Sequence, residues 1–480
     1  MPVAPVSDVW AGIFGLATVP LFADETVGGD VHTVLLDGGF GSFALSTTEE
    51  QLWREPKSYE WAWSSGLPHH VTVTDAEVAV VRWDNPEVEQ FSRRSVESRL
   101  DAFYGYLTSD RIQSSRRVVD HLVDSFRRVR SLVDQTGLGD EHSVEAFLFA
   151  LQLGMERSGR PVVIGSDRSG FASILPAGPL DSIVDGMMDG PGPMSALRLH
   201  PDLAIRHAGS EIFQEAHFSL ASASTSDLFD WVGPATAKRE TRGSAHFTPP
   251  ALARSIVEQT LEGIGDLQSR QSLVIYDPAC GSGSFLYEAL RTLRRLQFAG
   301  SLRIVGRDVS TAAISMARFT LALANADWMP SGGIEIDLQV ADFLTTEPVH
   351  ADVILMNPPF LSWTAMSSGQ RDQVRELMGS LLKGRADLSM VFVSRALRCL
   401  CPGGVLGVLI PSSLLSLLSA EKWREAITSD ADIRMIASLG DYGLFRHAMV
   451  QVAALVLSLK DGAHQRPEAA LAIISSNAAD

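Results

Sequence analysis

The residues with the clearest chemical potential are Asn357-Pro358-Pro359-Phe360, which carry one amide, two fixed backbone units and one aromatic ring. They follow residues 352–356, a run of mostly apolar β-formers that predicts a buried strand ending in a stiff turn. An Asn side chain can pair with an adenine edge, a Phe ring can stack on it, and the two prolines leave the Pro358 carbonyl as an acceptor. The motif is therefore a candidate for holding a flat base, although an ordinary strand-ending turn gives the same pattern.

A second candidate lies upstream, between a predicted buried strand at residues 272–276 and a helical pattern at residues 287–296. The connecting turn is Asp277-Pro278-Ala279-Cys280-Gly281-Ser282-Gly283. Its two glycines let the backbone approach a ligand closely, and the Asp at the strand end can accept hydrogen bonds. Strand, glycine turn and helix are the start of a nucleotide-type α/β fold. The third glycine of a dinucleotide fingerprint and the Lys of a phosphate-binding loop are both missing, so neither phosphate-binding site is predicted.

These two motifs, in this order, resemble the adenine-N6 DNA methyltransferases that use S-adenosylmethionine. The resemblance implies that Asn357, Pro358, Pro359 and Phe360 form the catalytic pocket, in which the Asn357 oxygen and the Pro358 carbonyl accept the two amino hydrogens of a flipped-out adenine. It also implies that the cofactor contacts Asp277, Ala279, Cys280, Gly281 and Gly283.

A third segment, His246-Phe247-Thr248-Pro249-Pro250, precedes a helical pattern at residues 251–261. It is similar to the family segment that closes over the methionine end of the cofactor, and its upstream position matches the gamma motif order of type I modification subunits and fused type II methylases. In that resemblance Thr248 contacts the cofactor carboxylate and Phe247 forms a packing wall. A Pro just before a helix is also a plain capping signal.

Two further acids complete the resemblance. Residues 302–308 predict a strand that ends in Asp308, where the family places an acid against the ribose hydroxyls of the cofactor. Residues 334–340 predict a third strand, followed by Asp342 and Phe343, which resemble the family segment near the cofactor's adenine. Either Asp could instead cap the turn that follows it.

The remaining pattern predicts the fold class as α/β: a doubly wound, Rossmann-like methyltransferase sheet at residues 241–480 that ends in an antiparallel hairpin at residues 433–439 and 450–459. Residues 1–89 predict an acidic, mixed α/β domain, and residues 90–240 predict a mainly helical arm and linker. Within the arm, residues 171–194 are rich in Gly, Pro and Met and are expected to form a loop or lid.

Charge limits how such a protein could meet DNA. The chain has 40 basic and 57 acidic residues, a formal net charge of −17, whereas a stand-alone duplex binder usually has a basic face. Residues 1–89 alone hold 14 acids and 3 bases. The arginines at residues 90–160 could hold phosphates, but 11 bases meet 10 acids there, so a salt-bridged helix surface is favoured.

The composition also indicates where the protein is located and whether it has disulfide bonds or a metal site. No apolar run approaches the roughly 20 residues of a membrane span, and the N-terminus lacks a basic secretory start, so a cytoplasmic protein is expected. Cys280, Cys399 and Cys401 are too few for a disulfide framework. His207 and His217 lack the spacing of metal ligands, so no metal site is predicted.

The resemblance implies double-stranded DNA as the substrate, in a restriction-modification or phage-defence system. The family's sequence-reading domain normally follows the last catalytic strand, where only residues 460–480 remain, so we expect a separate specificity subunit or a longer parent chain. Three alternatives stay open: an RNA adenine methyltransferase, a protein glutamine methyltransferase, and a cofactor-binding scaffold subunit that is inactive alone.

Overall fold

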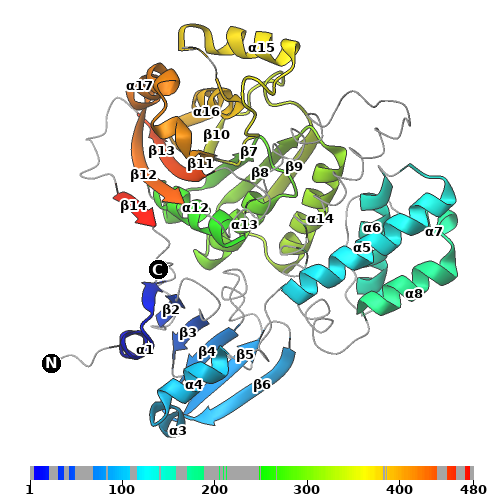
Figure 1. Cartoon of the computed structure of the whole chain (residues 1–480), viewed down its shortest axis with the longest axis vertical. Helices are drawn as coiled ribbons and strands as arrows, with labels where there is room; N and C mark the ends of the chain where they lie inside the picture. Colours follow the sequence, from blue (N-terminus) through cyan, green and yellow to red (C-terminus); the bar gives the residue numbers. More distant parts are fainter. Residues whose placement is uncertain are drawn as a thin grey trace.

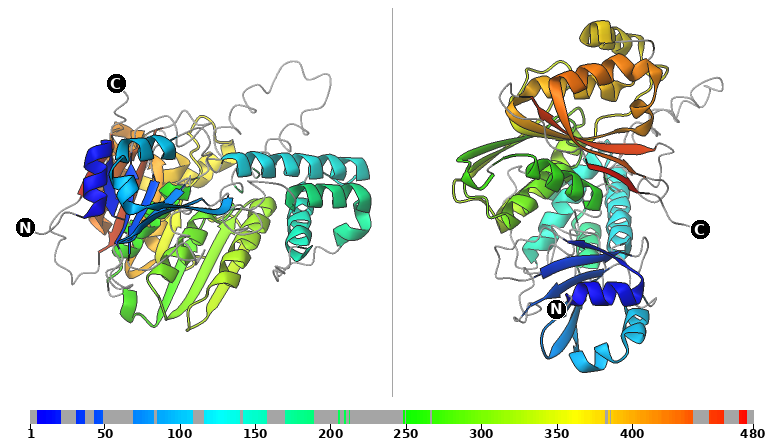
Figure 2. Two further views of the ribbon diagram at one scale, coloured as in Figure 1. Left: turned by 90° about the horizontal axis from the view of Figure 1, so that it is seen from below. Right: turned by 90° about the vertical axis from the view of Figure 1, so that its left-hand side faces the viewer.

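The structure of the chain, a computed structural model, describes residues 5–20, 31–36, 43–48, 69–82, 85–108, 116–139, 142–157, 170–188, 205, 209, 212, 248, 250–265, 267–381, 384, 386–439, 451–460 and 471–475. These residues form two β-sheets with the helices that pack on them, as Figure 1 and Figure 2 show. The larger sheet belongs to the C-terminal half, and the two main motifs lie at the ends of its strands β7 and β10.

The larger sheet is mostly parallel. Its strands are β7 (Ser272–Asp277), β8 (Ser301–Asp308), β9 (Ile334–Val340), β10 (Ala351–Met356), β11 (Leu400–Pro411), β12 (Ala431–Leu439), β13 (Val452–Leu459) and β14 (Leu471–Ser475). The spatial order is β14-β12-β13-β11-β10-β7-β8-β9. Neighbours from β11 to β9 are parallel, whereas β13 is antiparallel to both β11 and β12. The predicted doubly wound sheet with an antiparallel hairpin is therefore confirmed, and β14, which pairs in parallel with β12, was not predicted.

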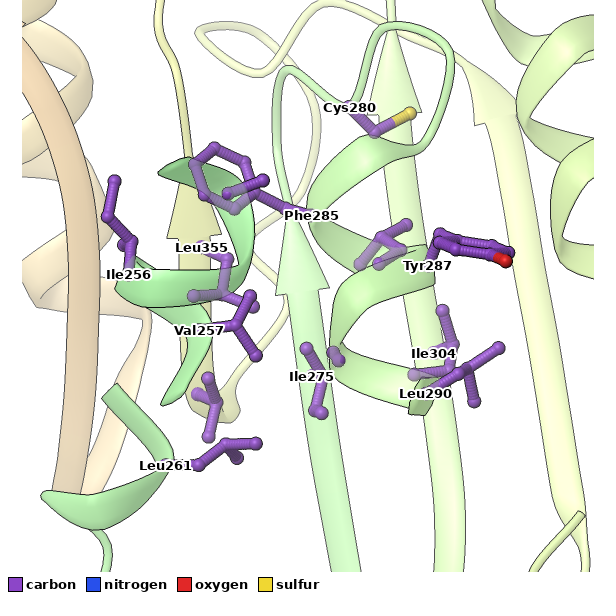
Figure 3. Close-up of a cluster of buried hydrophobic side chains, with 14 of the residues drawn as sticks. Ile256, Val257, Leu261, Ile275, Cys280, Phe285, Tyr287, Leu290, Ile304 and Leu355 are labelled. Carbon is purple, nitrogen blue, oxygen red and sulfur yellow. The ribbon is translucent and has the colours of Figure 1, made fainter. Parts of the chain in front are cut away.

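Helices cover both faces of this sheet. They are α12 (Pro250–Glu262), α13 (Ser284–Arg295), α14 (Thr311–Asp327), α15 (Ser368–Met378), α16 (Leu388–Cys399) and α17 (Glu421–Asp430). α12, α13 and α14 share one buried cluster with the sheet, and α15, α16 and α17 share another on the opposite face. Figure 3 shows the first cluster, in which Val257 of α12 and Leu290 of α13 lie over Ile275 and Leu355 of the sheet. Burial of this apolar area is the main stabilising term.

A six-stranded sheet forms the N-terminal unit. It consists of β1 (Ala17–Pro20), β2 (Val31–Leu36), β3 (Phe43–Thr47), β4 (His69–Val73), β5 (Glu77–Arg82) and β6 (Asn85–Ser92) in sequential order, with α1 (Val6–Phe14), α3 (Arg93–Glu97) and α4 (Leu100–Leu107) beside it. Trp10 of α1 and Phe103 of α4 pack edge to face at 5.7 Å inside the cluster that holds the sheet. The packed unit thus continues past residue 89, and the division of the chain into domains stays a prediction.

The arm is a helical bundle made of α5 (Arg116–Thr136), α6 (Ser143–Arg157), α7 (Gly170–Ile174) and α8 (Ala177–Met188). The expectation of a loop or lid at residues 171–194 is wrong for the part that the structure describes. α8 buries Leu180, Val184 and Met187 at helical spacing against the bundle. Gly178 and Pro179 lie in its first turn, where the missing backbone N–H of proline costs nothing, so they start the helix and do not break it.

The arm docks on α14. Met316, Phe319 and Leu323 of α14 belong to the same buried cluster as the arm, whereas Ile314 and Ala317 belong to the cluster under the sheet. A helix that is apolar on all sides needs two partners. The Ser315 hydroxyl also donates to the Glu145 carboxylate of α6, which fixes the orientation of the arm. Figure 1 shows α6 beside α14.

Gly407 of β11 lets α12 lie close to the sheet. A Cβ atom at this position would lie 2.1 Å from the Thr260 hydroxyl oxygen and 3.0 Å from Cγ2 of Ile256, both on α12. The Thr260 hydroxyl is itself fixed, because it donates to the Ile256 carbonyl at 2.6 Å. Any larger residue at position 407 must therefore push α12 outward.

We predict that Gly407→Ala lowers the free energy of unfolding by about 1–3 kcal/mol, the usual cost of overpacking a core. Gly186→Ala in α8 is the matched control, because no atom lies within 4 Å of its added methyl group and the change should be neutral or stabilising. Urea unfolding of the two variants measures the difference. Equal stability of Gly407→Ala and the wild type would contradict the close packing of α12.

Candidate functional site

The two main motifs meet at the point where the strand order reverses. From β7 the chain proceeds outward through β8 and β9, then returns to β10 on the other side of β7 and continues to β11. β10 and β7 are parallel neighbours in a register that pairs Ile354 with Tyr276, so both strands end at the same edge. Crevices beyond the carboxyl ends of strands at such a switch point are the usual ligand sites of open α/β sheets.

The glycine turn after β7 needs glycine at two positions. Gly281 has φ +51° and Gly283 has φ +86°, a left-handed backbone that L side chains rarely adopt. Gly283 also precedes α13 directly, and a Cβ on it would lie 3.2 Å from Ala317 of α14. Gly281 meets no atom within 4 Å of such a Cβ, so its side of the turn is open. A ligand can therefore approach the turn closely on the side of Gly281.

Two carboxylates, Asp277 and Asp308, accept hydrogen bonds from backbone N–H groups of the turn. Asp277, which is 1% exposed, accepts a hydrogen bond from the Ala279 N–H at 3.0 Å. Burial raises the pKa of Asp277 well above its ordinary value, and the nearby Asp308 carboxylate raises it further. Cys280 is also buried, its N–H donates to the Arg307 carbonyl at 2.9 Å, and burial raises the pKa of its thiol. Its role in the turn is to fill space, because a neutral, buried thiol is a poor nucleophile.

Asp308 lies at the end of β8 and bridges two loops. One carboxylate oxygen accepts the Gly281 N–H at 2.9 Å, and the other accepts the Ser310 N–H at 2.9 Å. A carboxylate can accept up to about four hydrogen bonds, so Asp308 can orient the turn and still bind ligand hydroxyls. The structure thus brings two of the predicted cofactor contacts, Asp308 and Gly281, into direct contact.

Asp342 and Phe343, the two predicted cofactor contacts after β9, have different roles in the structure. Asp342 uses its carboxylate to accept the Leu344 N–H at 2.9 Å, the turn-capping role considered from the sequence. The Phe343 ring is 3% exposed and packs in the core, edge to face with Tyr276 at 6.0 Å and tilted against Phe392 at 5.2 Å. Any contact of Phe343 with a ligand at the sheet edge would therefore come from its backbone.

Sequence reasoning overlooked Val309. This side chain follows Asp308 directly and is 72% exposed, and Val340 at the end of β9 is 49% exposed. Exposed apolar side chains next to a carboxylate that can bind hydroxyls suit a flat ring attached to a sugar. The signal available in the sequence was an apolar residue immediately after the acid at a strand end.

The loop after β10 is tied to the segment before α12. The Asn357 side-chain nitrogen donates to the Thr248 hydroxyl at 3.1 Å, across 109 positions of sequence. Thr248 is 6% exposed and Pro358 is buried. Since the amide nitrogen faces Thr248, the amide oxygen points in another direction. Phe360 is 7% exposed and packs in the cluster under α12, so only a small part of its ring can face the site.

Other predicted residues are outside the described part of the chain. Phe247 is one of them, as are His207 and His217. Among the described residues, no group of three or more His, Cys, Asp or Glu has the arrangement of a metal site.

The N-terminus of α16 is hydrogen-bonded to the loop that carries Asn357. Ser362 and Asp387 form an isolated β-bridge, and the Leu388 N–H donates to the Leu361 carbonyl at 3.0 Å. Asp387 caps α16 by accepting the Ser389 N–H at 2.9 Å. Burial raises the pKa of Asp387 to about 6, and its hydrogen bonds to Ser389 oppose this shift.

Fold and site together define a doubly wound α/β protein in which the two main motifs meet at the switch point of the strand order. The model of the N-6 DNA Methylase family matches residues 225–477, more than half of the 480-residue chain. The chain belongs to the N-6 DNA methylase family.

Curated relatives match the chain over shorter stretches. The type II methyltransferase M.BanIII of Aneurinibacillus aneurinilyticus is 28% identical over 220 residues, which cover 43% of this chain and 37% of that protein. The type II methyltransferase M.TthHB8I of Thermus thermophilus is 29% identical over 191 residues, 38% of each chain. The methylase subunit of the type I restriction enzyme MjaIX of Methanocaldococcus jannaschii is 31% identical over 119 residues, 25% of this chain and 19% of that protein. The chain thus spans less than two fifths of the length of each relative.

Similarity among solved structures is modest. A protein from Listeria monocytogenes assigned to the class I S-adenosylmethionine-dependent methyltransferases has a TM-score of 0.49 and 17% identity, covering 76% of this chain and 94% of that chain. The strand order by itself defines the fold of this chain.

Among the helices that the structure describes, none has the length and apolarity needed to cross a membrane.

Asp387 makes stability depend on pH. Its pKa is raised in the folded state to about 6, so its stabilising effect is full below the unfolded pKa of about 4 and is lost as the pH rises to 6. We predict that Asp387→Asn, which keeps a capping oxygen, removes this part of the pH dependence and is more stable than the wild type above pH 6. Urea unfolding between pH 4.5 and 7 measures it, with Asp372→Asn on the exposed side of α15 as the control. Parallel pH profiles for wild type and Asp387→Asn would refute the shift.

Proposed function

We propose that this chain transfers a methyl group from S-adenosylmethionine to N6 of a flipped-out adenine in double-stranded DNA. The observation that carries the proposal is the meeting of the glycine turn and the Asn357 loop at the ends of β7 and β10, with Thr248 bonded to Asn357. Family membership supports the same chemistry. The adenine, the cofactor and the site-specific action on DNA are proposals for this chain.

The residues present fit the proposed cofactor. Gly281 leaves an open side on the turn, Asp308 can accept ribose hydroxyls, and the exposed Val309 offers an apolar face to an adenine ring. The N-terminus of α13 follows the turn directly, and its partial positive charge favours the cofactor's carboxylate. When bound, S-adenosylmethionine supplies a methyl group on a sulfonium, which is an excellent leaving group.

The chain's own task is to hold and polarise the target amine. The lone pair of an adenine amino group is conjugated with the ring, so it must be localised before it can act as a nucleophile. We assign this work to the Asn357 amide oxygen and the Pro358 carbonyl, which would accept the two amino hydrogens, while Pro359 keeps the loop rigid. Phe360 forms the stacking wall, with the small part of its ring that is exposed. No covalent nucleophile is required.

Thr248 acts as a positioning residue in this proposal. Its hydroxyl oxygen accepts from the Asn357 amide nitrogen at 3.1 Å, and its hydroxyl proton can be donated to the cofactor carboxylate. One side chain then links cofactor binding to the orientation of the amide. The nitrogen donates to Thr248, and the amide oxygen is the atom that we assign to the base.

A partner would supply sequence recognition. The formal net charge is −17, and described arginines of the arm meet acids: Arg127 pairs with Asp124 at 3.1 Å, and Arg157 pairs with Asp185 at 3.0 Å. These pairs reduce the arm's capacity for phosphate contacts. A separate specificity subunit within a restriction-modification or phage-defence system is therefore part of the proposal, and a matched type I methylase subunit supports it.

The proposal is tested by offering duplex DNA, RNA and a glutamine-containing peptide to the purified chain, alone and with its neighbouring gene products. We expect N6-methyladenine in duplex DNA. Methyl transfer to RNA or peptide but not to DNA would establish one of the alternative enzymes instead. Cofactor binding without transfer to any substrate, even with partners present, would establish the scaffold.

Asn357→Ala should lower the rate of methyl transfer and leave cofactor binding nearly unchanged, whereas Gly281→Ala should weaken cofactor binding. Removing the amide should lower the transfer rate by about 10² or more, since aligned polar groups at a reacting centre contribute that much, while the cofactor's Kd changes by less than about twofold. Gly281→Ala should raise that Kd by about tenfold, because its φ of +51° costs a side chain about 1–2 kcal/mol. Calorimetric cofactor titration and a methylation assay separate the two effects. A wild-type rate for Asn357→Ala would exclude the pocket assignment.

Thr248→Val and Thr248→Ser test the positioning role. The Val variant keeps the shape but loses the acceptor, and the loss of a hydrogen bond worth about 1.5 kcal/mol should lower kcat by about tenfold. The Ser variant keeps the hydroxyl and should retain most of kcat. A Val variant whose KM for the cofactor rises while kcat is unchanged would show that Thr248 binds the cofactor without orienting Asn357.

A further inference from the structure

A cavity lies away from the switch point, between α15, α16 and the loop that precedes β10. Its volume is about 190 Å³, and its described lining includes His350, Leu377, Val391, Ser394, Arg395 and Arg398. His350 comes just before the first residue of β10, so the cavity is near the amino end of this strand, opposite the end that carries Asn357. It is therefore separate from the candidate methyl-transfer site.

The polar lining is basic. Arg395 and Arg398 are three residues apart on α16 and lie on one side of the helix. Among the described residues that line the cavity none is acidic, and neither arginine forms an ion pair with a described carboxylate. By contrast, Arg127 and Arg157 of the arm and Arg307 of β8 pair with acids. Two neighbouring guanidinium groups repel each other when no carboxylate is present. A bound anion would remove this repulsion.

Arg395 is held in a fixed position. Its Nη2 donates to the Thr346 carbonyl at 2.6 Å, and its guanidinium carbon lies 5.4 Å from the centre of the Phe343 ring. A guanidinium fixed by a carbonyl and an aromatic face loses little entropy when it binds a ligand. Ser394 and His350 add a hydroxyl and an imidazole to the same lining. These groups are typical donors to phosphate oxygens.

The volume of the cavity limits the size of the ligand that it can hold. Drug-sized ligands occupy pockets of roughly 300–1,000 Å³, and this cavity is smaller, at about 190 Å³. It exceeds by far the roughly 30 Å³ of one water molecule. A single tetrahedral phosphate group fits, either as the free anion or as the terminal group of a larger molecule whose remainder stays outside.

We propose that the α15–α16 cavity is a phosphate-binding site in which Arg395 and Arg398 grip one phosphate group, with Ser394 and His350 as additional donors. The phosphate could be free or belong to a nucleic-acid backbone, because both present the same oxygens. The proposal does not depend on the methyl-transfer assignment, since it concerns another part of the sheet and a different set of residues.

Calorimetric titration of the full chain with inorganic phosphate, against chloride at equal ionic strength, tests the site. We expect saturable phosphate binding that Arg395→Gln/Arg398→Gln weakens by at least tenfold. The matched control is Arg127→Gln/Arg128→Gln, which removes two exposed charges from α5 and should leave the affinity unchanged. Arg398→Gln alone, at an exposed position, should weaken binding without disturbing the fold, which circular dichroism checks.

A second arm of the experiment identifies the source of the phosphate. A short DNA duplex is titrated with and without saturating phosphate at constant ionic strength. Competition that disappears in Arg395→Gln/Arg398→Gln assigns the site to the DNA backbone, and binding of phosphate without competition assigns it to a free phosphate or a phosphorylated small molecule. Phosphate binding no stronger than that of chloride, or equal affinity in the wild type and the pocket variants, overturns the proposal.

Discussion

The parallel pairing of β7 with β10 is the constraint on which the candidate site depends. These strands are neighbours in space although β8 and β9 separate them in the chain. Their shared register brings the glycine turn and the Asn357 loop to one edge of the sheet. α12 then lies across β10 and β11, closely enough to require Gly407, and so delivers Thr248 to Asn357. A slip in the pairing would separate the groups, because each loop is rigid only relative to its own strand.

Buried and half-buried charged side chains hold the loops in the half of the site that faces the proposed cofactor. Asp308 accepts N–H groups from both loops at its strand end. Its neighbour Arg307 is 5% exposed and pairs with Asp337 in the middle of β9 at 2.8 Å, which links β8 to β9. Removing one partner of such a pair would leave an uncompensated buried charge, so this network favours a single arrangement of the turn. The neighbouring Asp277 has a raised pKa, in keeping with burial beside a second carboxylate.

The helical arm is coupled to this region through α14. One side of α14 packs under the sheet, the other packs against α6, and its N-terminus begins three residues after Asp308. The Glu145 contact with Ser315 lies one turn into that helix. A partner that displaced the arm would therefore act on the helix that follows the proposed ribose ligand. The chain thus has a physical route by which assembly could affect the site.

Much of the catalytic half could be predicted from the sequence, because apolar runs, glycine turns and capping residues act locally. The strands that end at or directly before Asp277, Asp308 and Asn357 were identified in this way, and so was the doubly wound class. The same reasoning was wrong about α8, where composition suggested a loop but Val184 and Met187 at helical spacing pack into the bundle. It also gave no sign of β14, a short strand that is defined by its pairing with β12.

The sequence by itself determined which side chains could do chemistry and which strand end carries each of them. Only the tertiary structure decided which of them meet: Asn357 with Thr248, Asp308 with Gly281, and Phe343 with the core in place of the sheet edge. The reason is physical, since periodicity is set by neighbours along the chain, whereas strand order and helix docking depend on contacts between residues far apart in sequence.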